Sequence, residues 1–105
     1  MAFERLRDSV TKGNLWIYIL TELEKEEVSP SDLRSRVRES YGVNAAAITF
    51  YSVIYRLRKE GLVRKSTDSF RSTYQVTPKG KGELEKARRL LKEVGRWMDR
   101  TSRAS

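Results

Sequence analysis

The stretch ITFYSVIYRLRKEGLVRKS, residues 48–66, changes its hydrophobic period at Gly61. Before this glycine, apolar residues recur three and four positions apart, as they do on one face of an α-helix. After it, apolar and polar residues alternate, which indicates a half-buried β-strand. The sequence therefore predicts a helix that ends at Gly61 and a strand, LVRKS, that follows directly.

The helix predicted over residues 45–60 has two different faces. At about 100° per residue, its core side is predicted to contain Ala46, Phe50, Val53, Ile54 and Leu57. The opposite side is predicted to contain Ala45, Ile48, Thr49, Ser52, Tyr55, Arg56 and Lys59, with Tyr51 and Arg58 at the margin. Small, hydroxyl-bearing and basic side chains suit a helix that enters a DNA major groove. The alternative is an ordinary amphipathic helix with a solvated outer face.

The flanking segments complete an order of helix, helix, helix, strand, strand, helix. Further helices are predicted over residues 2–9, 15–26, 30–41 and 78–99, and the second strand over STYQVT, residues 72–77. Ser29, Pro30 and Asp32 form a helix start, and Gly42 a helix end. Three helices followed by a two-stranded hairpin predict a mainly helical α+β fold, the winged helix-turn-helix, with a long C-terminal dimerisation helix.

This order divides the chain into four parts. We expect an N-terminal helical extension (residues 1–14), a winged-helix DNA-binding domain (15–77), a dimerisation helix (78–99) and a disordered tail (100–105). Apolar residues three and four apart along the last helix are typical of a coiled-coil-like seam. The predicted dimer interface consists of Leu84, Leu90, Leu91, Val94, Trp97 and Met98. In the alternative, Trp97 and Met98 complete the core of the monomer.

Composition and charge narrow the functional classes. The 105 residues include no cysteine and no histidine, which removes disulfides and the commonest general base and metal ligand. We therefore expect neither an enzyme nor a cofactor. No apolar run approaches the roughly 20 residues of a membrane span, and we expect a cytoplasmic protein that does not bind membranes. Of the net charge of +8, residues 44–82 contribute 8 basic against 2 acidic groups, which favours a surface that binds a polyanion.

The predicted hairpin adds cations beside the third helix. Arg64, Lys65 and Arg71 flank its turn, where a winged helix would place them near the DNA backbone. Phe70 either contacts a sugar or folds back on the sheet. Other basic residues are predicted either to contact phosphate or to serve solubility and ion pairing: Arg34, Arg36, Arg38, Lys79 and Lys81. The full set of predicted DNA contacts is Ala45, Ile48, Thr49, Tyr51, Ser52, Arg56, Arg64, Lys65 and Arg71.

Three segments resemble the PadR-type winged-helix transcription regulators. They are KGNLWIYILTEL (residues 12–23), TFYSVIYRLRKEGLV (49–63) and STYQVTPKGKGEL (72–84). The chain departs from the family pattern at VSPSDL, where PadR-like proteins usually carry a Gly-Tyr pair. The resemblance implies dimerisation through the last helix with help from N-terminal residues, and repression at a palindromic operator. Because some members sense small aromatic molecules, Trp16 and Trp97 are candidates for an effector pocket, against the alternative that both are core residues.

The sequence thus favours a homodimeric, sequence-specific regulator that binds double-stranded DNA. Two alternatives remain at this level. Exposed Ile48 and Tyr55 would also suit a winged-helix module that docks on another protein. The charge of +8 would suit a sequence-neutral architectural protein that binds nucleic acid.

Overall fold

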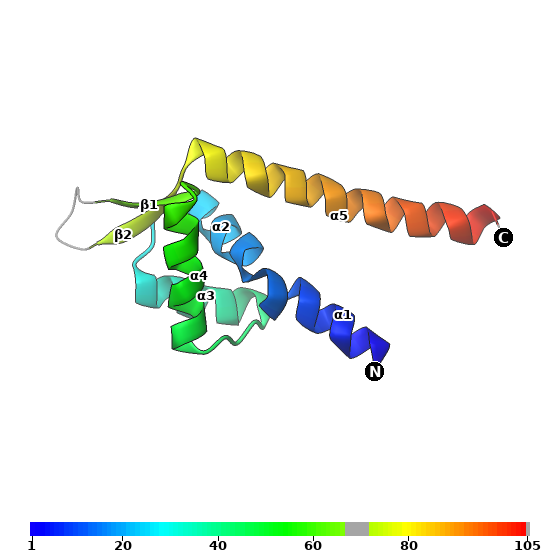
Figure 1. Ribbon diagram of the computed structural model, residues 1–105, viewed down its shortest axis with the longest axis horizontal. Helices are drawn as coiled ribbons and strands as arrows, with labels where there is room; N and C mark the ends of the chain where they lie inside the picture. The colour runs from blue at the N-terminus through cyan, green and yellow to red at the C-terminus, as the bar shows by residue number, and fades with distance from the viewer. Residues whose placement is uncertain (67–71, 105) are drawn as a thin grey trace.

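The computed structural model describes residues 1–66 and 72–104, with side chains as far as Arg100. The chain begins with two short helical segments and ends in one long helix (Figure 1). The elements in chain order are α1 (Ala2–Val10), the 3₁₀ turn η1 (Lys12–Asn14), α2 (Leu15–Lys25), α3 (Pro30–Tyr41), α4 (Ala47–Lys59), β1 (Val63–Ser66), β2 (Thr73–Val76) and α5 (Pro78–Ala104). This is the predicted mainly helical winged helix-turn-helix.

The core lies between α2, α3, α4 and the sheet. Phe50, Ile54 and Leu57 of α4 are at most 2% exposed, as their three- and four-residue spacing predicts. They meet a stripe of α2 and one of α3, and the buried apolar set is Leu15, Ile19, Leu20, Leu23, Val28, Leu33, Val37, Val43, Phe50, Ile54, Leu57, Leu62, Val63 and Leu84. Val53 packs partly buried against this cluster. The inner face of α4 is therefore fully used in holding the domain together.

The helix α3 begins and ends as the sequence predicts. The Ser29 hydroxyl accepts a hydrogen bond from the backbone N–H of Asp32, and Pro30 occupies the first helical position. At the other end, Gly42 adopts the left-handed conformation with φ of 69°, and its N–H donates to the Arg38 carbonyl. This glycine directs the chain away from α3 toward α4.

The start of α4 differs from the predicted start at residue 45. The helix begins at Ala47, and Ala46 is the extended residue before it, with φ of −60° and ψ of 147°. The Arg34 guanidinium donates two hydrogen bonds, of 3.2 and 3.1 Å, to the Ala45 carbonyl. These bonds hold Ala45 in the loop, and Ala46 is exposed rather than part of the core.

The wing is an antiparallel pair in which Val63 lies opposite Val76 and Ser66 opposite Thr73. Gly61, with φ of 78°, turns the chain from α4 into β1, as the change of hydrophobic period predicts. A single bridge between Val28 and Tyr74 adds the α2–α3 loop to the other edge of β2. The wing is therefore attached to the helical core along its base. The predicted turn residues Phe70 and Arg71 lie outside the described residues.

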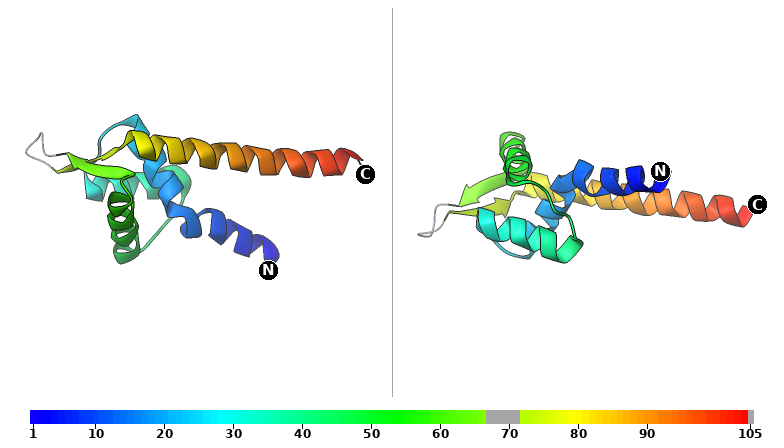
Figure 2. Two further views of the ribbon diagram at one scale, coloured as in Figure 1. Left: turned by 45° about the horizontal axis from the view of Figure 1, so that its top comes forward. Right: turned by 90° about the horizontal axis from the view of Figure 1, so that it is seen from below.

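The helices α1 and α5 extend from the same side of the domain (Figures 1 and 2). The helix α5 runs as far as Ala104, whereas the sequence predicts an end at Asp99 and a disordered tail. Its side chains from Arg89 to Arg100 are all exposed. Trp97 and Met98 remain 48% and 68% exposed, so the alternative in which they complete the monomer's core is wrong. The long projecting helix gives the molecule principal extents of 59 × 29 × 22 Å.

Candidate nucleic-acid interface

The outer face of α4 is exposed and carries most of the residues that the sequence predicts to contact DNA. Ile48 and Tyr55 are 83% and 61% exposed, and Thr49, Ser52 and Arg56 are exposed beside them. These residues point away from the core because they alternate with Phe50, Ile54 and Leu57 around the helix. The structure therefore brings together all the predicted contact residues that belong to α4.

Tyr51 lies at the edge of this face and is fixed by an aromatic contact. Its ring meets that of Phe50 edge-on, with centroids 5.7 Å apart, while 39% of the residue stays exposed. An edge-to-face pair of this kind favours one ring orientation. The hydroxyl is therefore held on a rigid ring at the border of α4.

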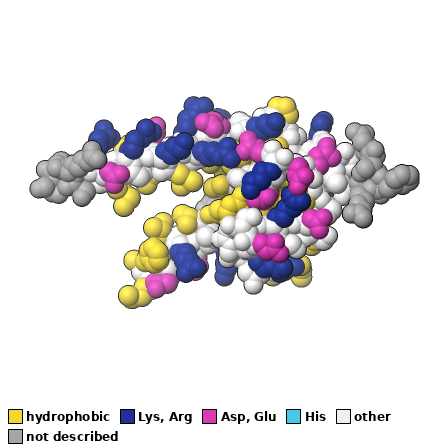
Figure 3. Space-filling view, turned by 180° about the vertical axis from the view of Figure 1, so that it is seen from behind, with side chains coloured by type: hydrophobic (Ala, Val, Ile, Leu, Met, Phe, Trp, Pro, Cys, Tyr) yellow, Lys and Arg dark blue, Asp and Glu magenta, His cyan; other side chains and the backbone are white. Residues whose placement is uncertain are grey.

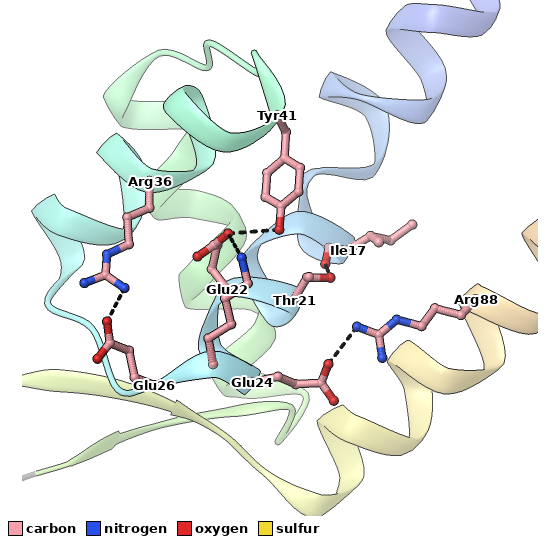
Figure 4. A network of polar contacts seen from close by, with 9 residues as sticks. Ile17, Thr21, Glu22, Glu24, Glu26, Arg36, Tyr41 and Arg88 are labelled. Atoms are coloured by element: carbon pink, nitrogen blue, oxygen red, sulfur yellow. Dashed lines mark hydrogen bonds and ion pairs between the residues drawn. The ribbon is translucent and has the colours of Figure 1, made fainter.

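Several residues that were predicted to contact DNA, or to serve solubility and ion pairing, make contacts within the chain. Ala45 precedes α4, is half-buried against the core, and presents its carbonyl to Arg34. That guanidinium is therefore engaged by a loop carbonyl just before α4. Lys79 Nζ likewise donates a hydrogen bond of 2.8 Å to the Glu60 carbonyl at the end of α4, where a cation also complements the helix dipole. Arg36 pairs with Glu26 (Figure 4), whereas Arg38 and Lys81 are exposed.

Cations gather where the end of α4 meets β1. An open depression there is lined by Tyr55, Arg58, Lys59, Val63, Arg64 and Lys65. Lys59 lies over the Tyr55 ring at 5.5 Å, and Arg58 over the Tyr74 ring at 6.0 Å. The Arg64 Nε atom donates to Gln75 Oε1 of the facing strand at 2.7 Å. These contacts place the basic groups along one border of the α4 face, where a phosphate backbone would lie.

A buried carboxylate on α2 was missed from the sequence. Glu22 is 2% exposed and accepts hydrogen bonds of 2.9 Å from both Lys25 and the Tyr41 hydroxyl (Figure 4). Burial opposes its charged form, but these two donors outweigh burial and keep the pKa of Glu22 below its ordinary value of 4.5. The signal was an acidic residue within the apolar stripe of α2. The bond from Tyr41 joins α3 to α2 and so supports the frame that carries α4, whereas the bond from Lys25 lies within α2.

A second exposed surface, the apolar seam, lies on the projecting helices. On α5 it consists of Leu90, Leu91, Val94, Trp97 and Met98, and on α1 of Phe3, Leu6 and Val10, all 38–70% exposed. Figure 3 shows hydrophobic side chains on the sides of α5 and α1 that face each other across the space between them. Leu84 does not belong to this seam, contrary to the prediction. It is 0% exposed and lies in the core of its own domain, because the first turns of α5 still lie over α2.

The two tryptophans that are predicted to form an effector pocket line two separate surface depressions. Trp16 lies with Arg56, Leu57, Glu60, Leu62 and Glu83 between α2, α4 and α5. Trp97 lies near the far end of α5, beside Glu93, Arg96, Asp99 and Arg100. One chain therefore does not bring them into a common pocket, and an effector site built from both stays a prediction.

Among the described parts of the chain, no group of three or more His, Cys, Asp or Glu side chains is arranged to hold a metal ion. No helix within residues 1–66 and 72–104 is long and apolar enough to cross a membrane.

Similarity to known proteins is found in structure rather than in sequence. No protein-family model and no curated protein sequence matches the chain. A PadR-like transcription factor from Bacteroides fragilis superposes with a TM-score of 0.74 at 24% identity, covering 90% of this chain and 96% of that one. A PadR-like transcriptional regulator from Bacillus cereus gives a TM-score of 0.73 at 25% identity, covering 84% and 90%.

A PadR family transcription regulator from Clostridium difficile gives a TM-score of 0.70 at 23% identity, with 81% of this chain and 94% of that one covered. These matches cover 90–96% of each regulator. The chain has the PadR-like winged helix-turn-helix fold.

Proposed function

We propose that this protein is a transcriptional regulator that binds double-stranded DNA sequence-specifically. The observation that carries the proposal is the composition of the α4 outer face. Its middle is apolar and hydroxyl-bearing, and its border with β1 is basic. Apolar and hydroxyl-bearing side chains suit contacts with base edges, and basic side chains suit contacts with phosphates. The similar solved structures are named as transcriptional regulators, which agrees with this assignment.

We further propose that the protein acts as a homodimer on a palindromic operator. The apolar seam of α1 and α5 supports this, because contiguous exposed apolar side chains on a projecting helix commonly mark a protein interface. A two-fold dimer would present two copies of α4 to the DNA. Half-sites about 34 Å apart, one helical turn, would then be required for both to enter the major groove on one side. Occupation of such an operator would repress transcription.

Selection of bound duplexes from random DNA, followed by competition in a gel-shift assay, tests the proposal. At roughly physiological salt, the selected duplex should be preferred over competitor DNA by about 10³-fold or more. A palindromic consensus would support the dimer, and reduced expression of a reporter placed behind it would support repression.

Docking on another protein is the second candidate, because Ile48 and Tyr55 are exposed apolar groups on α4. Absence of DNA binding would favour that reading. Equal binding of all duplexes would favour architectural binding driven by net charge, and either result would exclude a sequence-specific regulator.

A further inference from the structure

The first nine residues of α4, Ala47 to Tyr55, contain no charged and no amide side chain. Their outer face is a shallow, mostly apolar depression lined by Ala47, Ile48, Tyr51, Ser52 and Tyr55. Ile48 stands at the second position of the helix and is 83% exposed. The cations of α4 come only after this segment, from Arg56 onward. The helix therefore begins with an apolar surface and ends with a basic one.

This order limits how α4 can distinguish bases. Guanine is read by Arg or Lys, and adenine by Asn or Gln, through paired hydrogen bonds. The first nine residues of α4 offer none of these side chains. The hydroxyls of Thr49 and Ser52 both accept and donate hydrogen bonds. They can therefore pair with several base edges and discriminate little between bases. The selective contact that remains open to these nine residues is an apolar contact with the 5-methyl group of thymine.

We propose that α4 selects its operator through thymine 5-methyl groups, with Ile48 as the principal contact. This inference rests on the proposed function. The N-terminal residues of a recognition helix are those that contact base edges, and Ile48 occupies that place. Tyr51, one turn on, and Tyr55, two turns on, would flank the isoleucine and exclude water from the contact. Arg58, Lys59, Arg64 and Lys65 border the same surface, and their charge fits the phosphates beside a groove.

Replacing thymine by deoxyuridine, one position at a time, tests the inference with the unaltered protein. This change deletes only the methyl group and keeps base pairing. In the selected duplex, at least one thymine per half-site should weaken binding about fourfold when replaced, as expected for one methyl group's worth of apolar contact. Replacement in both half-sites should weaken binding about sixteenfold, because two equal and separate contacts add in free energy. Deoxyuridine outside the selected site should leave the affinity unchanged.

Ile48→Ala assigns the contact to its residue. The variant should bind the thymine and deoxyuridine duplexes equally, so that the fourfold difference disappears. Thermal melting of the variant should match that of the parent, since Ile48 lies outside the core.

A selected duplex that binds equally well with uracil at every position would overturn the inference and leave the proposed function standing. A fourfold uracil effect that persists in Ile48→Ala would reject Ile48 as the contact. Failure to select any duplex would instead overturn the proposed function.

Discussion

The Nζ atom of Lys79 donates a hydrogen bond of 2.8 Å to the Glu60 carbonyl, which joins the first turn of α5 to the residue that ends α4. The Thr77 hydroxyl adds a second bond, of 2.6 Å, to the carbonyl of Gly61. The end of α4 and the start of α5 thus form one joint. In the proposed dimer, this joint would connect each α5 helix directly to the α4 helix of the same chain.

Gly80 allows the start of α5 to pack closely against Leu62 and Val76, and its replacement should destabilise the folded chain. A Cβ atom at Gly80 would lie 2.3 Å from the Leu62 carbonyl oxygen and 2.9 Å from Val76 Cγ2. We expect Gly80→Ala to lower the free energy of unfolding by roughly 1–3 kcal/mol, the usual effect of overpacking. Urea unfolding measures this. Gly82→Ala is the matched control, because its Cβ would meet nothing described within 4 Å, and it should stabilise by about 0.4–1 kcal/mol. Equal stabilities of the two variants would contradict the close packing.

The Glu22 carboxylate should make stability depend on pH in the acidic range. Because its pKa is lower in the folded chain than the ordinary 4.5, its contribution is present above 4.5 and is lost as the pH falls through the folded value. Glu22→Gln should therefore be less stable than the parent at pH 7, and the difference should shrink below pH 4.5. Glu39→Gln, on the exposed side of α3, is the control and should show no such trend. A Glu22→Gln difference that is constant with pH would refute this role of the charge.

The apolar seam should decide the oligomeric state. Val94→Glu places a charge among Leu90, Leu91 and Trp97, and desolvating it in an interface would be costly. Sedimentation velocity should show dimers for the parent chain and monomers for this variant. Lys92→Glu introduces the same side chain on the opposite side of α5 and should leave the dimer intact. Dimers in Val94→Glu would remove the seam from the proposed interface.

Some features of the fold and of the candidate site could be predicted from the sequence, and others could not. The inner face of α4 follows from residue spacing alone, because Phe50, Ile54 and Leu57 share one side of any helix. The start of α4 does not, because the Ala45 carbonyl just before it accepts hydrogen bonds from Arg34, which lies 11 residues before Ala45 in the chain. The Glu22 contact with Tyr41, 19 residues away, is likewise tertiary. Periodicity also continues through Leu84 into the seam without a break, so the sequence could not show where the core ends along α5.

The basic border should govern the salt dependence of DNA binding. Lys65 lies on the exposed side of β1 and lines the depression next to α4. If Lys65 neutralises one phosphate in each chain of the proposed dimer, Lys65→Ala should reduce the slope of log affinity against log salt by about 1.8. Lys92→Ala, an equal change of charge on α5, should leave the slope unaltered. The same loss of slope in both variants would mean that only net charge matters.

Tyr51 should contribute a single hydroxyl contact. Tyr51→Phe keeps the ring against Phe50 and should leave thermal melting unchanged. Loss of one hydrogen bond of about 1 kcal/mol from each chain of the proposed dimer would weaken DNA binding roughly 30-fold in a fluorescence-anisotropy titration. Unchanged affinity would exclude the hydroxyl from the interface.

Mapping the bound duplex on the protein by NMR tests the central claim most directly. Amide signals of a ¹⁵N-labelled sample should shift, on addition of the selected duplex, in α4 and β1, with the largest changes near Ile48, Ser52 and Lys65. The signals of α5 from Leu90 onward should stay in place. Shifts confined to α1 and α5, with α4 unaffected, would contradict the assignment of the α4 face to DNA.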